Sequence, residues 1–205
     1  MHVHDILNDP MNNNELPSDF RKALLEMLRD VRHAEPLRAA ALAGRLTPWT
    51  TALTSAAVEA CQRLGWRASA KGHHAELLPV SRGEYLNLDV MAFGAGESRW
   101  RFPLAVMELE NQTREDFIAY SLWKLLSVRA ELRVLFCYRK EAAEAGPLRK
   151  HLQEQVVEAL GIGNRVKLEG STVLVIGRRG EAETFPNGFF AWWELETNTG
   201  RFESF

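Results

Sequence analysis

Three acidic side chains lie where they could together hold a cation. Glu108 and Glu110 end the apolar run of residues 101–112, and 18 residues separate Asp89 from Glu108. If the run is a β-strand, both glutamates point to the same face, because alternate side chains of a strand share a face. Partly buried carboxylates repel each other and lose hydration, and a hard divalent cation compensates for both effects. The spacing therefore predicts a metal site.

The flanking elements would bring the three acids together. Residues 101–112 are apolar at both parities, which is typical of a strand covered on both faces. Residues 84–93 alternate in the manner of a strand, and the linker GAGES at 94–98 predicts a hairpin that puts Asp89 beside the glutamates. A capping-box-like start at Thr113 and Asp116 opens a helix to about residue 128, and the apolar run 132–138 predicts a buried parallel strand. Strand, helix and strand then form a right-handed crossover.

The rest of the chain supplies further helices and strands. Helical spacing of apolar residues predicts helices at 18–33, 47–64 and 147–160. Short strands are expected at 66–70, 75–80, 172–177 and in the aromatic segment 188–195. We therefore expect an α/β (α+β) fold with a central mixed sheet of four to six strands flanked by helices.

Composition sets the broad class of the protein. The 205 residues are 46% hydrophobic, so they can bury one core, and we expect a single domain over residues 1–205 with a flexible tail at 1–17. The net charge of −2 excludes a strongly basic binder of polyanions. The two cysteines fit buried apolar positions, and neither a secretory signal nor an apolar run of about 18 residues occurs. We expect a cytoplasmic protein without membrane contact, and the sequence leaves a homodimer open.

The element order carries a resemblance to a known family. Helix, three-stranded meander, helix and strand, with acids at Asp89, Glu108 and Glu110, resembles the core of the PD-(D/E)XK nuclease superfamily, which has the restriction-endonuclease-like fold. The resemblance covers residues 47–138. It implies that Asp89 and Glu108 bind Mg²⁺ or Mn²⁺, with the carbonyl of Leu109 as a further ligand, and that the third motif position activates water.

The motif departs from the family pattern at that third position. Glu110 stands where the family usually has lysine, which resembles a minority of D…E-x-E sites in which the third acid acts as a base or holds a second metal ion. Lys124 on the following helix could supply the missing lysine, and Tyr120 and Ser121 share its polar side of that helix. A solvent-facing lysine is the alternative. Glu59 could assist a metal ion, with a solvated helix acid as the simpler explanation. Asn111 and Gln112 could orient water or phosphate, with ordinary turn residues at the helix start as the alternative.

The resemblance implies a metal-dependent nuclease that hydrolyses phosphodiester bonds in nucleic acid, DNA being the expected partner. The alternative is a catalytically inactive scaffold of the same fold that binds protein or nucleic acid through the aromatic segment 188–195. A third reading is a metal-dependent hydrolase of another phosphate substrate. Five basic residues could neutralise backbone phosphates or serve only solubility: Lys71, Arg82, Arg99, Arg101 and Arg114.

Overall fold

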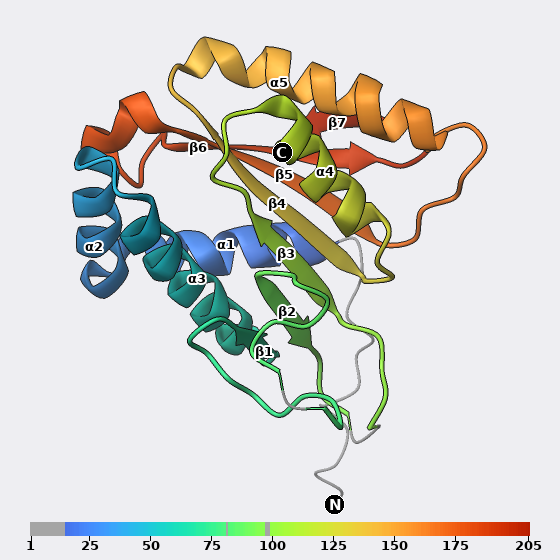
Figure 1. Cartoon of the computed structure of the whole chain (residues 1–205), viewed down its shortest axis with the longest axis horizontal. Coiled ribbons are helices and arrows are strands. Elements are labelled where there is room, and N and C mark those ends of the chain that lie inside the picture. Colours follow the sequence, from blue (N-terminus) through green and yellow to red (C-terminus); the bar gives the residue numbers. More distant parts are fainter. Residues whose placement is uncertain (1–14, 81, 97–98) are drawn as a thin grey trace, which may run out of the picture.

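The computed structural model describes residues 15–80, 82–96 and 99–205, and a mixed β-sheet forms its centre (Figure 1). The sheet has seven strands in the order β1-β2-β3-β4-β5-β6-β7. The pairs from β1 to β3 are antiparallel, those from β3 to β5 are parallel, and those from β5 to β7 are again antiparallel. The strands are β1 (Arg67–Ala70), β2 (Val90–Phe93), β3 (Ala105–Leu109), β4 (Leu132–Arg139), β5 (Ser171–Arg178), β6 (Phe190–Glu196) and β7 (Arg201–Ser204).

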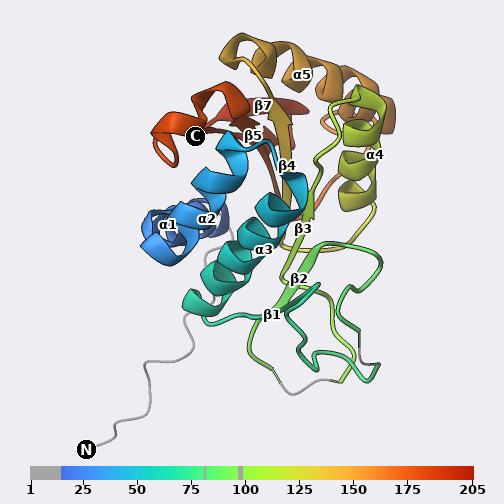
Figure 2. The same cartoon turned by 60° about the vertical axis from the view of Figure 1, so that its left-hand side comes forward.

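Helices cover both faces of the sheet (Figure 2). Helices α1 (Leu16–Arg29), α2 (Val31–Leu42) and α3 (Leu46–Arg63) pack on one face, where their apolar side chains join one buried cluster with those of the sheet. Helices α4 (Glu115–Leu126) and α5 (Ala145–Leu152) cover the other face with a second cluster, and α5 continues as a π-helical segment, Gln153–Glu158. The predicted α/β class and the mixed sheet with flanking helices are confirmed.

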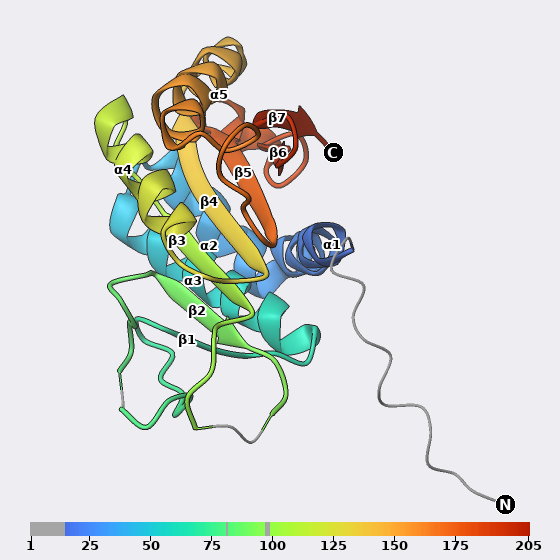
Figure 3. The ribbon, with the colours of Figure 1, turned by 90° about the vertical axis from the view of Figure 1, so that its right-hand side faces the viewer.

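The central strands follow one another across the sheet (Figure 3). Every residue of β3 and β4 is buried, which agrees with apolar side chains at both parities. The parallel pairing of β3 with β4 across α4 confirms the predicted connection. The sheet has one strand more than the four to six expected, because β7 buries only Phe202 and its exposed polar residues give no strand signal.

Several predicted boundaries are wrong. The predicted strand 84–93 begins only at Val90, because Leu86 and Asn87 form a turn with φ of 56° and 53°. Residues 75–80 form no strand. The predicted helix 18–33 is broken at Asp30, whose side chain accepts a hydrogen bond from the N–H of Arg32 and caps α2. Helix α4 begins at Glu115 without a side-chain cap from Thr113.

The structure describes only part of the predicted N-terminal tail. Helix α1 begins at Leu16, so residues 16–17 are helical, while residues 1–14 of the predicted tail lie outside the described residues.

Among the helices of the described residues, none combines the length and apolar character needed to cross a bilayer.

Candidate functional site

Asp89 and Glu108 face each other at one end of the β2–β3 hairpin. Val90 pairs with Met107, so the same antiparallel register carried one residue further puts Asp89 opposite Glu108. The carboxylate Oδ2 of Asp89 accepts a hydrogen bond from the N–H of Leu109 at 2.7 Å. Residues of the same parity, Met91 and Val106, join the buried cluster under α4, so both acids belong to that face of the sheet. The structure therefore brings these two predicted residues together.

Lys124 reaches the same place from α4. Its Nζ lies 2.7 Å from Oε1 of Glu108 and donates a hydrogen bond to the carbonyl of Asn87 at 2.8 Å. The side chain of Lys124 is 21% exposed and that of Glu108 is 8% exposed, so the solvent-facing alternative for this lysine is wrong. The left-handed turn at Asn87 presents its carbonyl to the ammonium, which fixes the lysine between the turn and β3.

Burial shifts the pKa of both acids upward. Desolvation raises the pKa of Glu108 to about 7, although the Lys124 ammonium opposes the shift, and the negative charge of Asp89 adds to it. Desolvation also raises the pKa of Asp89, against the hydrogen bond from the Leu109 N–H, with Glu84 as a further negative neighbour. The ionised forms of these two neighbouring acids are therefore disfavoured by burial and favoured by the positive charge of Lys124.

Glu110 shares the α4 face but is satisfied by other groups. Its Oε1 accepts a hydrogen bond from the N–H of Gln112 at 2.7 Å, and its Oε2 accepts one from the hydroxyl of Ser121 at 3.1 Å. Gln112 thus contributes its backbone, and its side chain is exposed. Both oxygens of Glu110 are therefore used as acceptors, and the acid anchors the start of α4 to β3.

Asn111 points to the opposite side of the sheet. Its Nδ2 donates to the hydroxyl of Thr50 on α3 at 2.7 Å and to the carbonyl of Leu109 at 3.2 Å, while its Oδ1 accepts from Arg179 at 3.4 Å. The Leu109 carbonyl, predicted as a metal ligand, is thus engaged by the Asn111 amide. These contacts tie the end of β3 to α3 and do not place Asn111 with the acids.

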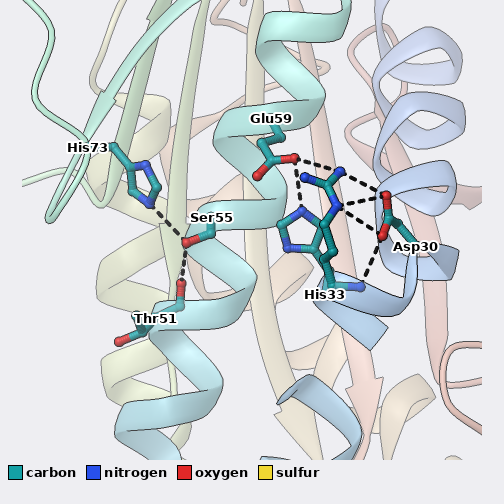
Figure 4. Close-up of polar contacts among 7 residues, drawn as sticks. Asp30, His33, Thr51, Ser55, Glu59 and His73 are labelled. Carbon is teal, nitrogen blue, oxygen red and sulfur yellow. Dashed lines mark hydrogen bonds and ion pairs between the residues drawn. The ribbon is translucent and has the colours of Figure 1, made fainter. Parts of the chain in front are cut away.

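Two further candidates are also kept away from the acids. Glu59 lies on α3, where its Oε2 pairs with Nε2 of His33 at 3.0 Å, and Figure 4 shows this contact beside Asp30. Tyr120 is 58% exposed and stacks on Trp123, with ring centroids 5.8 Å apart. Tyr120 thus points to solvent beside Trp123, whereas Ser121 and Lys124 of the same helix contact Glu110 and Glu108.

Two of the predicted phosphate-binding residues have partners of their own. Arg101 donates to the carbonyls of Gly94 and Gly96 at the far end of the hairpin, and Arg114 pairs with Asp116. Ser121, which was expected on the polar side of the helix with Lys124, donates its hydrogen bond to Glu110. Sequence reasoning missed the carbonyl of Asn87, because a strand was expected there.

Comparisons with protein-family models, with curated proteins and with solved structures find no match to this chain. The arrangement of the side chains must therefore support any function by itself.

The described acids fall short of a complete set of metal ligands. Within residues 15–80, 82–96 and 99–205, no group of three or more His, Cys, Asp and Glu side chains is arranged to hold a metal ion. This agrees with the engaged oxygens of Glu110. Asp89 and Glu108 still fit one hard cation, because Mg²⁺ is commonly bound by one or two carboxylates and completes its coordination with water and substrate phosphate. The residues present thus suit a single-metal site better than the predicted set that also included Leu109 and Glu110.

Proposed function

We propose that this protein is a metal-dependent nuclease with a restriction-endonuclease-like core, acting on phosphodiester bonds in nucleic acid, with DNA as the expected substrate. The order α3, β1, β2, β3, α4, β4 agrees with the order that the resemblance to the PD-(D/E)XK superfamily implies. One observation carries the proposal: Lys124, 2.7 Å from Glu108, restores a lysine to a motif that has Glu110 in its place.

Each residue of the site would have a separate role in hydrolysis. Asp89 and Glu108 would hold Mg²⁺ or Mn²⁺, which when bound would polarise a phosphate and make water more acidic. The Lys124 ammonium stabilises negative charge that develops on the phosphate, since it lies in a half-buried site where charge interactions are stronger than in water. Ser121 and the Gln112 N–H hold Glu110 in place, which makes Glu110 a positioning residue for α4.

The proposal predicts a specific loss of activity. Purified protein should nick supercoiled plasmid in Mg²⁺ or Mn²⁺ and not in EDTA. Lys124→Met should reduce the rate at least about 100-fold, because removal of a single charge-stabilising donor typically costs this much. Lys150→Met is the matched control, because Lys150 is 71% exposed on α5. Equal nicking by Lys124→Met and wild type would contradict the assignment.

A non-catalytic scaffold is the second candidate, and the engaged oxygens of Glu110 favour it. Such a scaffold would not act through the aromatic segment 188–195 as we expected, because Phe189 and Trp192 are buried. Exposed aromatic side chains instead lie along α4: Phe117, Tyr120 and Trp123. No nicking by the wild type in either metal, with nucleic-acid binding that Tyr120→Ala abolishes, would favour the scaffold.

A further inference from the structure

Two basic dipeptides lie at the carboxyl ends of adjacent parallel strands. Arg139-Lys140 ends β4 and Arg178-Arg179 ends β5. The register pairs Arg139 directly with Arg178, so their side chains share a face. Cys137 and Ile176, two residues earlier in each strand, join the cluster under α4 and α5, so the two guanidinium groups lie on the same face as the acids.

Of the two arginines, only Arg139 has a negative partner among the described residues. Like charges directly opposite each other on neighbouring strands are destabilising. Arg139 is buried, and its guanidinium pairs with Oε1 of Glu115 at 3.5 Å and donates a hydrogen bond to the carbonyl of Tyr138 at 3.0 Å. Arg178 forms no ion pair with the described residues, and its buried Nε has no hydrogen-bond acceptor among them. An anion bound between the two side chains would satisfy both.

The position of the pair relates it to the candidate site. The N–H of Glu110 donates to the carbonyl of Phe136 on β4, which puts Glu110 beside Cys137, two residues before Arg139. Glu108 pairs with Leu135, and Leu135 pairs with Leu174, so the two arginines lie one and two strands across from Glu108 and four residues further along. At about 4.8 Å between strands and about 3.3 Å per residue, their backbones are roughly 14 and 16 Å from that of Glu108. Ligands of open α/β sheets bind at the carboxyl ends of the strands. A nucleic-acid strand several nucleotides long could therefore contact both the pair and the acids.

We propose that Arg139 and Arg178 bind a backbone phosphate of a nucleic-acid strand, a few nucleotides from the phosphate that lies at Asp89 and Glu108. The planar guanidinium group matches phosphate oxygens with two parallel hydrogen bonds. The proposal rests on the proposed function, which supplies the nucleic-acid strand. It adds the direction of that strand, which runs from the end of β3 across β4 to β5.

Binding without catalysis tests this subsite. A fluorescein-labelled single-stranded DNA oligonucleotide is titrated with protein in EDTA at several salt concentrations, and anisotropy is measured. Arg178→Gln should weaken binding about tenfold, because it removes charged hydrogen bonds, and should lower the slope of log affinity against log salt by about 0.7. Arg178→Lys should keep the slope and recover part of the affinity. Arg201→Gln, an exposed arginine of β7, is the matched control and should behave as wild type.

Stability separates a ligand-binding arginine from a structural one. Without DNA, Arg178→Gln should melt at or above the wild-type temperature, because it relieves repulsion with Arg139. A lower melting temperature with unchanged DNA affinity would overturn the proposal, and so would the absence of DNA binding by the wild type.

The outcomes also separate the subsite from the nuclease. Arg178-dependent binding without metal-dependent cleavage would support the subsite and refute the nuclease. Cleavage that Arg178→Gln leaves unchanged, with unchanged affinity, would support the nuclease and refute the subsite. Displacement of the oligonucleotide by an equal concentration of deoxythymidine monophosphate would overturn the assignment to a nucleic-acid strand.

Discussion

Replacing Glu108 with glutamine should make the stability of the protein less dependent on pH. Burial raises the pKa of Glu108 from 4.5 to about 7. Because the pKa in the folded state exceeds that in the unfolded chain, the folded state favours the protonated acid. This stabilisation is fully present below pH 4.5 and is lost as the pH rises through 7. At about 1.4 kcal/mol per pKa unit, the difference between 4.5 and about 7 corresponds to about 3 kcal/mol of stability.

Glutamine cannot ionise, so the variant does not lose stability through ionisation at this position as the pH rises. The free energy of unfolding of Glu108→Gln, minus that of the wild type, should therefore increase by about 2–3 kcal/mol between pH 5 and pH 8. Urea denaturation followed by the fluorescence of the six tryptophans measures both values at each pH. The difference between the two proteins cancels the titration of the groups that do not interact with Glu108.

The control is Glu154→Gln, because Glu154 lies at the surface of the segment that continues α5 and pairs with Lys150 there. Its difference from wild type should stay within about 0.5 kcal/mol at every pH. A difference between Glu108→Gln and wild type that is constant from pH 5 to pH 8 would show that Glu108 is not held in an environment that opposes its charge.

Two further predictions concern the buried core. Trp49→Phe removes the hydrogen bond from the indole N–H to the Tyr138 hydroxyl at 2.8 Å and should lower the free energy of unfolding by about 1–3 kcal/mol in urea denaturation; an unchanged value would show that the bond contributes nothing. Cys61 and Cys137 should not react with a thiol reagent at pH 8 in the folded protein, because burial raises both pKa values, that of Cys137 to about 12. Both should react in urea, and rapid reaction of the native protein would contradict the buried positions.

The sequence was informative where burial determines the pattern. Strands β3 and β4 are apolar at both parities, so their positions, their parallel pairing and the shared face of Glu108 and Glu110 could be predicted. The position of Lys124 could not be predicted with the same precision, because helical periodicity does not fix the rotation of α4 about its axis. Packing against the sheet decides that Lys124 turns inward while Tyr120 stays exposed.

Other features depend on contacts between distant segments. Helix α2 was not predicted, and Pro36 inside it lacks the N–H that a helix normally uses. The amide of Asn111 bonds to Thr50, 61 residues earlier, and no local pattern indicates such a pair. The pairing of Arg139 with Arg178 likewise follows from strand register, although two basic dipeptides at the ends of apolar runs were visible in the sequence.

Calorimetric titration of Mn²⁺ into the metal-free wild type and into Asp89→Asn tests the proposed centre most directly. The wild type should bind one ion per chain at pH 8, and Asp89→Asn should lose that binding while keeping its fold, because the asparagine carbonyl can still accept the hydrogen bond from the Leu109 N–H. Asp19→Asn, an exposed acid in the first turn of α1, should bind as wild type. Absence of Mn²⁺ binding by the wild type, or equal binding by Asp89→Asn, would contradict the proposed metal centre.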